Sequence, residues 1–343
     1  MKSRSQLWKA LVLAGLPAAV LFATAWLVGR PYGIWMALAE PLILGLGFYG
    51  VVWGLMERRP LIAGAIGSSV IAATVVLHEG PTNEVVLKGG SERIRALRGC
   101  SVLGKPAEGP VRLLTWTVDN GPQLADHIGE LIATHPDIVL LNGTDNPEIG
   151  VRLQEALDGE VKFFRGSVPG GGSIAVTRGS FQFCGGEEDE WLLDLPSLKD
   201  GGAKAVLGFP YVPNVGVVPL VFARLDSPAG VLDGSDWAER VVAGAETVAT
   251  VVRTVGSRGV VLVGDMQTPA SAAVVSRYWT ASGLSLAATG PNWPNDVGGV
   301  PFLSQHALDQ VWVGSGWRVQ ATRVLEIGDQ RRSPVMVDLI AAR

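Results

Sequence analysis

The sequence predicts an α/β domain preceded by three membrane-spanning helices, and two observations lead to this class. The 343 residues have a mean hydropathy of +0.29, and the apolar excess lies before residue 79. Beyond residue 110, short apolar runs typical of buried strands alternate with longer stretches whose apolar residues recur at helical spacing. We therefore divide the chain into a three-span region at 1–78, a connector at 79–110 and an outer domain at 111–343.

Three apolar runs near the N-terminus are each long enough for a membrane span. They cover residues 10–28, 34–56 and 61–77, and a bilayer core takes about 20 helical residues. Basic residues favour cytoplasmic loops, and they stand before the first run and between the second and third: Lys2, Arg4, Lys9, Arg58 and Arg59. This pattern predicts a bacterial cytoplasmic (inner) membrane protein whose C-terminal domain lies on the periplasmic or extracellular side.

Glu40 and the two cysteines have more than one interpretation. Glu40 lies within the second run beside Pro41, and it is either an interfacial or packing residue or a contact for a partner or lipid head group. Cys100 and Cys184 are too few for a disulfide framework or a zinc site. An oxidising outer location favours a disulfide between them, and two buried free thiols are the alternative.

The domain at 111–343 shows strand and helix patterns in alternation. Predicted strands occupy residues 113–114, 138–141, 161–164, 173–176, 217–225 and 259–263. Predicted helices occupy residues 123–134, 237–255 and 270–282. The helix at 237–255 has the clearest pattern, because Val241, Ala245, Val248 and Val252 recur at intervals of three and four residues.

Five short motifs follow one another in this domain. They are Trp116-Thr117, the run from Pro136-Asp137 to Asn142-Gly143, Gly264-Asp265-Met266-Gln267, the segment around Asp309, and the final stretch from Ser333-Pro334 to Asp338. Their order and spacing resemble the endonuclease/exonuclease/phosphatase superfamily. The three preceding runs resemble its membrane-anchored branch, which includes teicoplanin-resistance proteins. The resemblance implies a four-layer α/β sandwich with two β-sheets face to face and helices outside.

The resemblance also implies a cleft in which most catalytic side chains have been replaced. The family's chemistry uses a Mg²⁺ held by carboxylates, a base that activates water, and His or Asn that stabilises developing charge. Asp265 and Asp309 match the family pattern. The replacements are Thr117 for Asn, Asn142-Gly143 for Gln-Glu, Arg224 for the middle-strand His, Gln267 for Asn, and Arg331-Arg332 for the last Asp-His.

Three roles are open for this vestigial cleft, in which we expect no catalytic residue, metal or cofactor. In the first role, the arginines pair with Asp265 and Asp309 and fill the cleft. In the second, Arg224, Arg331 and Arg332 bind a phosphate or carboxylate. The third alternative is residual catalysis through Asp145 together with the two retained aspartates. Arginine itself does not activate water, because it keeps its proton at neutral pH.

Two classes of function follow from these features. The first is a non-catalytic pseudoenzyme that serves as a structural or binding subunit of a larger respiratory, photosynthetic or envelope complex. Its expected partners are the lipid bilayer and other membrane-protein subunits. The alternative is a divergent metal-dependent phosphatase or phosphodiesterase that acts on lipid-linked phosphates, the substrate class implied by the membrane-anchored branch. The net charge of −4 gives no attraction to nucleic acid, which usually needs a basic face.

Overall fold

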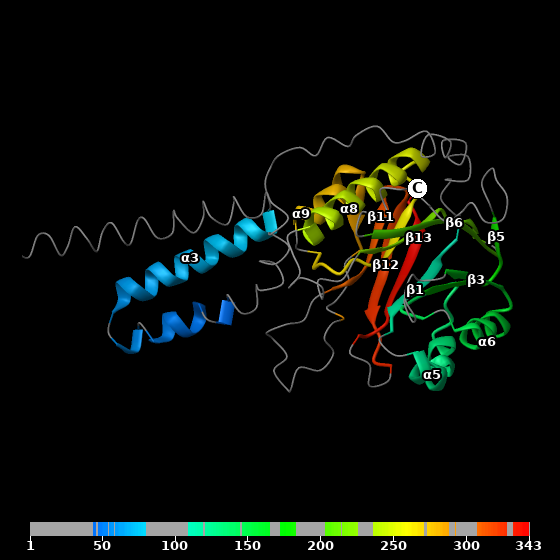
Figure 1. Cartoon of the computed structure of the whole chain (residues 1–343), viewed down its shortest axis with the longest axis horizontal. Helices are drawn as coiled ribbons and strands as arrows, with labels where there is room; N and C mark the ends of the chain where they lie inside the picture. Colours follow the sequence, from blue (N-terminus) through cyan, green and yellow to red (C-terminus); the bar gives the residue numbers. More distant parts are fainter. Residues whose placement is uncertain are drawn as a thin grey trace, which may run out of the picture. The chain divides into compact units, whose positions relative to one another are not determined.

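A computed structural model describes the chain in two compact units (Figure 1). The described residues are 44–45, 47–53, 55–57, 59–79, 109–118, 121–144, 146–164, 172–182, 203–213, 215–225, 236–270, 273–287, 292, 307–327 and 332–342. The first unit comprises Met1–Glu84, Thr268–Arg277 and Val297–Ser304. The second comprises Val85–Gln267, Tyr278–Asp296 and Gln305–Arg343.

Helix α3 (Pro60–Glu79) is the main element described in the first unit. Helical residues 47–53 pack against it through glycines, and a Cβ added to Gly47 would lie 2.3 Å from Val70 Cγ2. No helix within the described residues has both the length and the apolar character that crossing a membrane requires. The expected spans are thus not found among the described residues, and the run at 10–28 and part of the run at 34–56 lie outside them.

The second unit contains two mixed β-sheets. The first sheet has the order β12-β13-β1-β2-β4-β3. Its strands are β1 (Val111–Thr117), β2 (Ile138–Asn142), β3 (Glu160–Phe164), β4 (Ser173–Thr177), β12 (Trp317–Val324) and β13 (Val335–Ala341). The second sheet has the order β10-β11-β9-β8-β6-β5, with β7 paired to β6. Its strands are β5 (Ser180–Gln182), β6 (Ala203–Val212), β7 (Gly216–Val217), β8 (Leu220–Leu225), β9 (Val261–Asp265), β10 (Leu284–Leu286) and β11 (Asp309–Gly314).

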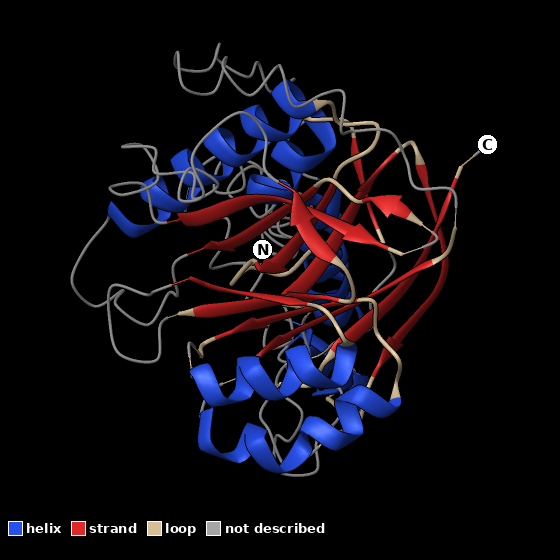
Figure 2. Cartoon of the chain, turned by 90° about the vertical axis from the view of Figure 1, so that its right-hand side faces the viewer, coloured by secondary structure: helices blue, strands red, loops and turns tan. Residues whose placement is uncertain are grey.

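Helices cover the outer faces of the two sheets (Figure 2). Helices α5 (Gly121–Ala133) and α6 (Pro147–Leu157) lie on the first sheet, and α8 (Asp236–Val255) packs on β6 and β8 of the second. A further helix, α9, extends from Ala273 to Ala281. Local sequence determines where α6 begins, because Asn146 accepts a hydrogen bond from the Glu148 amide at 3.0 Å and Pro147 takes the first helical position.

Alternation along the strands builds two apolar cores. Leu113 and Leu140 belong to the core between the sheets, whereas Leu114 and Val139 pack with residues of α5 and α6. Successive residues of a strand point to opposite faces, so a strand buried on both sides needs a continuous apolar run. The predicted sandwich of two sheets with helices is confirmed by these layers.

Prolines explain where the strand predictions differ from the structure. The predicted strand at 217–225 is divided into β7 and β8 at Pro219, which has no amide hydrogen for the ladder. Strand β6 was not predicted, because Gly208 and Pro210 are unfavourable within a strand. Pro210 lies within β6, where it is the register partner of Phe181 in β5, and its carbonyl accepts a hydrogen bond from the Val218 amide at 2.9 Å.

Candidate functional site

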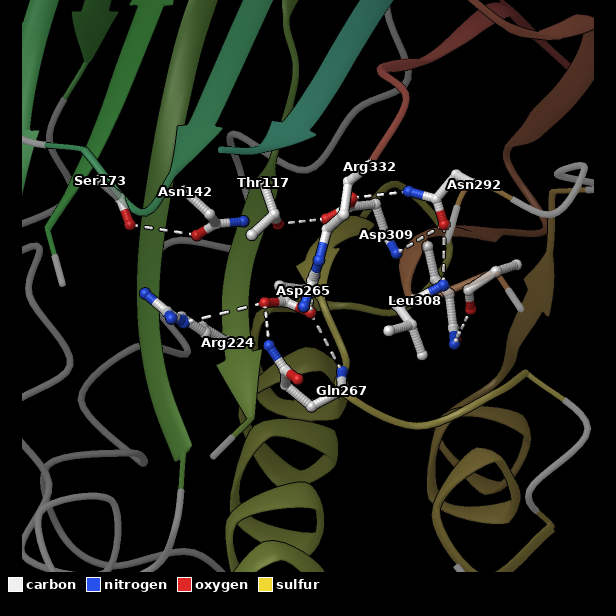
Figure 3. A network of polar contacts seen from close by, with 12 residues as sticks. Thr117, Asn142, Ser173, Arg224, Asp265, Gln267, Asn292, Leu308, Asp309 and Arg332 are labelled. Atoms are coloured by element: carbon white, nitrogen blue, oxygen red, sulfur yellow. Dashed lines mark hydrogen bonds and ion pairs between the residues drawn. The ribbon is translucent and has the colours of Figure 1, made fainter. Parts of the chain in front are cut away.

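The two sheets bring polar residues together at the carboxyl ends of β1, β2, β8 and β9 (Figure 3). In the second sheet, Arg224, Asp265 and Asp309 are register partners across β8, β9 and β11. In the first sheet, Thr117, Asn142 and Ser173 form the equivalent row across β1, β2 and β4. Strand register therefore gathers residues that are far apart in the sequence into one mostly buried group of polar side chains, which we call the cleft.

Asp265 is the centre of this cleft and is fully buried. The Arg332 guanidinium lies against it, with Nη1 2.9 Å from Asp265 Oδ1. Arg224 is further away, with Nε 3.9 Å from Oδ2. Gln267 donates to Asp265 through its backbone amide at 3.2 Å and through its side-chain amide. Figure 3 shows these three residues approaching the carboxylate from different sides.

Gln267 adopts an unusual backbone conformation to make these bonds. Its φ is +50°, and its side chain is buried. A residue other than glycine in this region costs about 1–3 kcal/mol and persists where the surroundings hold it. The two hydrogen bonds to Asp265 provide that restraint.

Asp309 is the second carboxylate, and it is also fully buried. It accepts hydrogen bonds from Thr117 Oγ1 and, at 2.6 Å, from Asn292 Nδ2. Burial, followed by the charge of Asp265, raises the pKa of Asp309 from 3.8 to about 6. The Arg332 charge and the two hydrogen bonds act in the opposite direction without reversing this shift.

Backbone contacts hold Arg332 at the cleft. The buried indole of Trp116 donates to the Arg332 carbonyl at 2.7 Å. The next residue, Ser333, donates its amide to the Asn292 carbonyl at 3.0 Å. The Arg332 side chain is 8% exposed. Its position is therefore set by the buried residues on either side of it.

Asn142 and Gly143 occupy the positions where the family resemblance expects Gln-Glu. Asn142 is fully buried and accepts from Ser173 Oγ at 3.1 Å, while its Nδ2 has no partner among the described residues. Gly143 has a φ of +82°, and a Cβ there would lie 2.2 Å from the Val118 carbonyl oxygen. The backbone at this position has no room for any side chain, including a carboxylate.

The described residues do not fit a divalent cation. Mg²⁺ needs near-octahedral oxygen ligands, yet no group of three or more His, Cys, Asp or Glu lies together in the described part of the chain. The two carboxylates that remain are engaged with Arg332, Gln267, Thr117 and Asn292. We therefore assign no chemical step to a metal ion.

The structure brings most of the site residues named from the sequence into this cleft. They are Thr117, Asn142, Arg224, Asp265, Gln267, Asp309 and Arg332, and Gly143 follows Asn142 in the chain. Arg331, Asp145, Glu40 and the pair Cys100 and Cys184 lie outside the described residues. Sequence reasoning missed Asn292 and Ser173, whose roles depend on contacts that span 17 and 31 residues respectively.

Comparisons with solved structures identify the fold. An endonuclease/exonuclease/phosphatase from Beutenbergia cavernae DSM 12333 is 21% identical, with a TM-score of 0.52, over 68% of this chain and 72% of that one. The human nocturnin catalytic domain with bound sulfate anion is 14% identical, with a TM-score of 0.50, over 69% of this chain and 96% of that one. No family model and no curated protein matches the sequence. The predicted resemblance is confirmed at the level of the fold.

Proposed function

We propose that this chain, which has the endonuclease/exonuclease/phosphatase fold, is a non-catalytic protein anchored to a membrane by its N-terminal region. In this proposal its folded domain lies on the outer side and serves as a structural or binding subunit of a larger membrane complex. The observation that carries the proposal is the 2.9 Å ion pair between Arg332 and Asp265 in the cleft. It places a permanent cation where the resemblance expects catalytic groups.

The chemistry of the cleft supports a role without catalysis. Hydrolysis needs a base that takes a proton from water, and an arginine does not serve as one at neutral pH. Asp309 has a raised pKa, but it is fully buried and both its oxygens accept hydrogen bonds. Position 143, where the family resemblance expects a metal-binding carboxylate, has no room for one.

Exposed apolar side chains support the membrane anchor. In the first unit, Phe48 is 72% exposed, Tyr49 69%, Met56 79% and Ile71 67%. Soluble surfaces rarely gather so many large apolar side chains on one short segment. A bilayer would cover them, in keeping with the three apolar runs and the basic residues that flank them.

An activity assay tests the catalytic part of the proposal. Purified protein is incubated with Mg²⁺ or Mn²⁺ and either a lipid pyrophosphate or a model phosphodiester, beside the Asp265→Ala variant. We expect hydrolysis at the background rate, because losing several catalytic groups removes about 10² to 10⁴ in rate for each, without full additivity. Turnover that disappears in Asp265→Ala would replace our proposal with the enzyme alternative, a phosphatase or phosphodiesterase of lipid-linked phosphates.

A topology assay tests the anchor. A reporter that is active only in the cytoplasm, fused after Arg343, should stay silent while the fusion remains in the membrane fraction. A bright reporter would contradict the orientation. Release of the fusion by a high-salt wash would contradict the anchor, because apolar insertion is insensitive to salt.

Two observations favour anion binding as a second role for the cleft. The Arg224 side chain is 30% exposed, and its Nε lies 3.9 Å from Asp265, beyond hydrogen-bonding distance. Asn142 Nδ2 supplies a buried donor without a partner among the described residues. Titration with inorganic phosphate and with acetate, followed by calorimetry, should show binding that Arg224→Gln removes and the exposed-surface control Arg318→Gln retains. Equal binding by both variants would reject this role.

A further inference from the structure

We infer that the Arg332 guanidinium is the built-in cation of this cleft, and that it excludes divalent metal ions by pairing with Asp265, the strand neighbour of Asp309. This inference rests on the proposed non-catalytic function and identifies what takes the place of a metal. It also predicts that removing one side chain exposes a cation site that the natural protein keeps closed. Four observations support it.

The first observation is the position of the carboxylates. Asp265 ends β9 and Asp309 begins β11, and the two residues are direct partners in antiparallel register. Both are fully buried. Two buried negative charges on adjacent strands repel each other, and a cation placed beside them offsets this repulsion. The raised pKa of Asp309 has the charge of Asp265 as one of its causes.

The second observation is how Arg332 reaches them. It lies three residues before β13 begins at Val335. Its carbonyl accepts from the Trp116 indole, and the Ser333 amide after it donates to Asn292. The fold therefore delivers the guanidinium to Asp265, with Nη1 at 2.9 Å, in a fixed position.

The third observation is that the carboxylate oxygens are already in use. Asp265 Oδ1 accepts from the Gln267 amide and faces Arg332, and Oδ2 accepts from the Gln267 side chain. Asp309 Oδ1 accepts from Thr117, and Oδ2 from Asn292. A metal ion would have to displace the charged Arg332 from Asp265, whereas the other donors are neutral groups and leave lone pairs on the carboxylate oxygens free for a metal ion.

The fourth observation is charge. A divalent ion placed beside the carboxylates would lie within a few ångströms of a guanidinium that cannot lose its proton. Repulsion between unit charges at such distances is large in a buried site. Arg224, with Nε 3.9 Å from Asp265, adds a second positive charge on the same carboxylate.

The test measures Mn²⁺ binding to the full chain in detergent, by electron paramagnetic resonance and by thermal unfolding. For the natural protein we expect no loss of the free Mn²⁺ signal and no shift in Tm relative to NaCl at equal ionic strength. For Arg332→Ala we expect one bound Mn²⁺ and a rise in Tm on the order of 5 °C at saturating metal. The double variant Arg332→Ala/Asp265→Asn should lose both effects.

Each outcome either supports or overturns the inference. Mn²⁺ bound by the natural protein and lost in Asp265→Asn would overturn it, and so would a folded Arg332→Ala variant that binds no Mn²⁺. If Arg332→Ala does not fold, Arg332→Gln provides the same test with less lost volume, and the measurement on the natural protein decides independently. Mn²⁺ binding without hydrolysis overturns this inference alone, whereas metal-dependent hydrolysis overturns the proposed function.

Discussion

The two ends of strand β1 carry charged networks built from the same residue types, and they differ in burial and in the balance of charge. At the start of β1, Arg112 Nε donates to Asp338 at 2.7 Å and Nη1 donates to the Thr134 carbonyl at 2.7 Å. Arg323 also donates to Asp338, at 2.9 Å. At the end of β1, Thr117 donates to Asp309, which forms a fully buried pair with Asp265, and the Arg332 guanidinium lies against Asp265.

The pKa shifts at the two ends go in opposite directions. Burial acts to raise the pKa of Asp338, but the hydrogen bonds and charges of Arg112 and Arg323 outweigh it, so that pKa is lowered. At Asp309, burial and a neighbouring carboxylate dominate, and the pKa is raised to about 6. The Asp338 carboxylate, which Arg112 and Arg323 share near solvent, thus stabilises the fold through ion pairs at the surface. At the other end, two fully buried carboxylates lie beside one buried arginine, Arg332.

Removing the arginine at the buried end should have the largest effect. We expect Arg332→Met to lower the free energy of unfolding by about 3–5 kcal/mol, because it leaves two buried carboxylates without their nearest cation. The measurement is urea unfolding followed by tryptophan fluorescence. The matched change at the open end, Arg112→Met, should cost less, because its side chain is 33% exposed and water replaces part of the interaction. Equal losses would remove the distinction between the two ends.

The buried end should also produce a pH dependence of its own. The folded-state pKa of Asp309 is raised from 3.8 to about 6, so its stabilising contribution is complete below pH 3.8 and is lost as the pH rises through about 6. A shift of about two pH units corresponds to about 3 kcal/mol. Relative to the natural protein, Asp309→Asn should therefore gain about this much stability between pH 4 and pH 7, measured by urea unfolding at each pH. A constant difference between the two proteins across this range would contradict the raised pKa.

The open end should show the opposite sign and a smaller effect. The folded-state pKa of Asp338 is lowered below 3.8, so its contribution is present above that pH and is lost as the pH falls through the lowered value. At pH 7, Asp338→Asn should cost about 1–3 kcal/mol, because hydrogen bonds to charged groups are lost. Thermal unfolding from pH 7 down to pH 2 should show the two proteins becoming equal in stability at the acid end. A difference that instead grows toward acid would contradict this assignment.

The outer arginine of the same network should matter least. The Arg323 side chain is 51% exposed, and exposed ion pairs contribute about 0.2–1 kcal/mol. Arg323→Ala should therefore lower stability by roughly this amount in dilute buffer and by less in about 1 M NaCl, where the Debye length is about 3 Å. Urea unfolding at the two salt concentrations measures the difference. A loss that persists in high salt would mean that the aliphatic part of Arg323 packs against β13.

Sequence patterns predicted the parts of the fold that depend on neighbouring residues. Leu113 and Leu114 face opposite cores, so a continuous apolar run identified β1. The spacing of Val241, Ala245 and Val248 identified α8, where all three are fully buried. Strand β6 escaped prediction, because Gly208 and Pro210 oppose strand formation locally and only pairing with β8 and β5 overrides that preference.

Local sequence patterns predict the contacts within the site even less well than they predict β6. Family-like motifs located Asp265, Asp309 and the replacements around them, because each motif is a short stretch of chain. The bonds between them are not local: Thr117 and Asp309 are 192 residues apart, and Trp116 and Arg332 are 216 apart. No local pattern contains such pairings. The sequence offered Arg224, Arg331 and Arg332 as partners of the two aspartates, but the choice of Arg332 for Asp265, and of Asn292 for Asp309, required the structure.

Gly143 has a consequence for engineering this cleft. The carbonyl of Val118 lies where the first side-chain atom of any replacement would be placed, and the backbone has a φ of +82°. Replacing Gly143 with glutamate would therefore strain the fold instead of adding a metal ligand. A carboxylate at this position needs a second change that moves the Val118 carbonyl, so no single substitution of Gly143 can supply one.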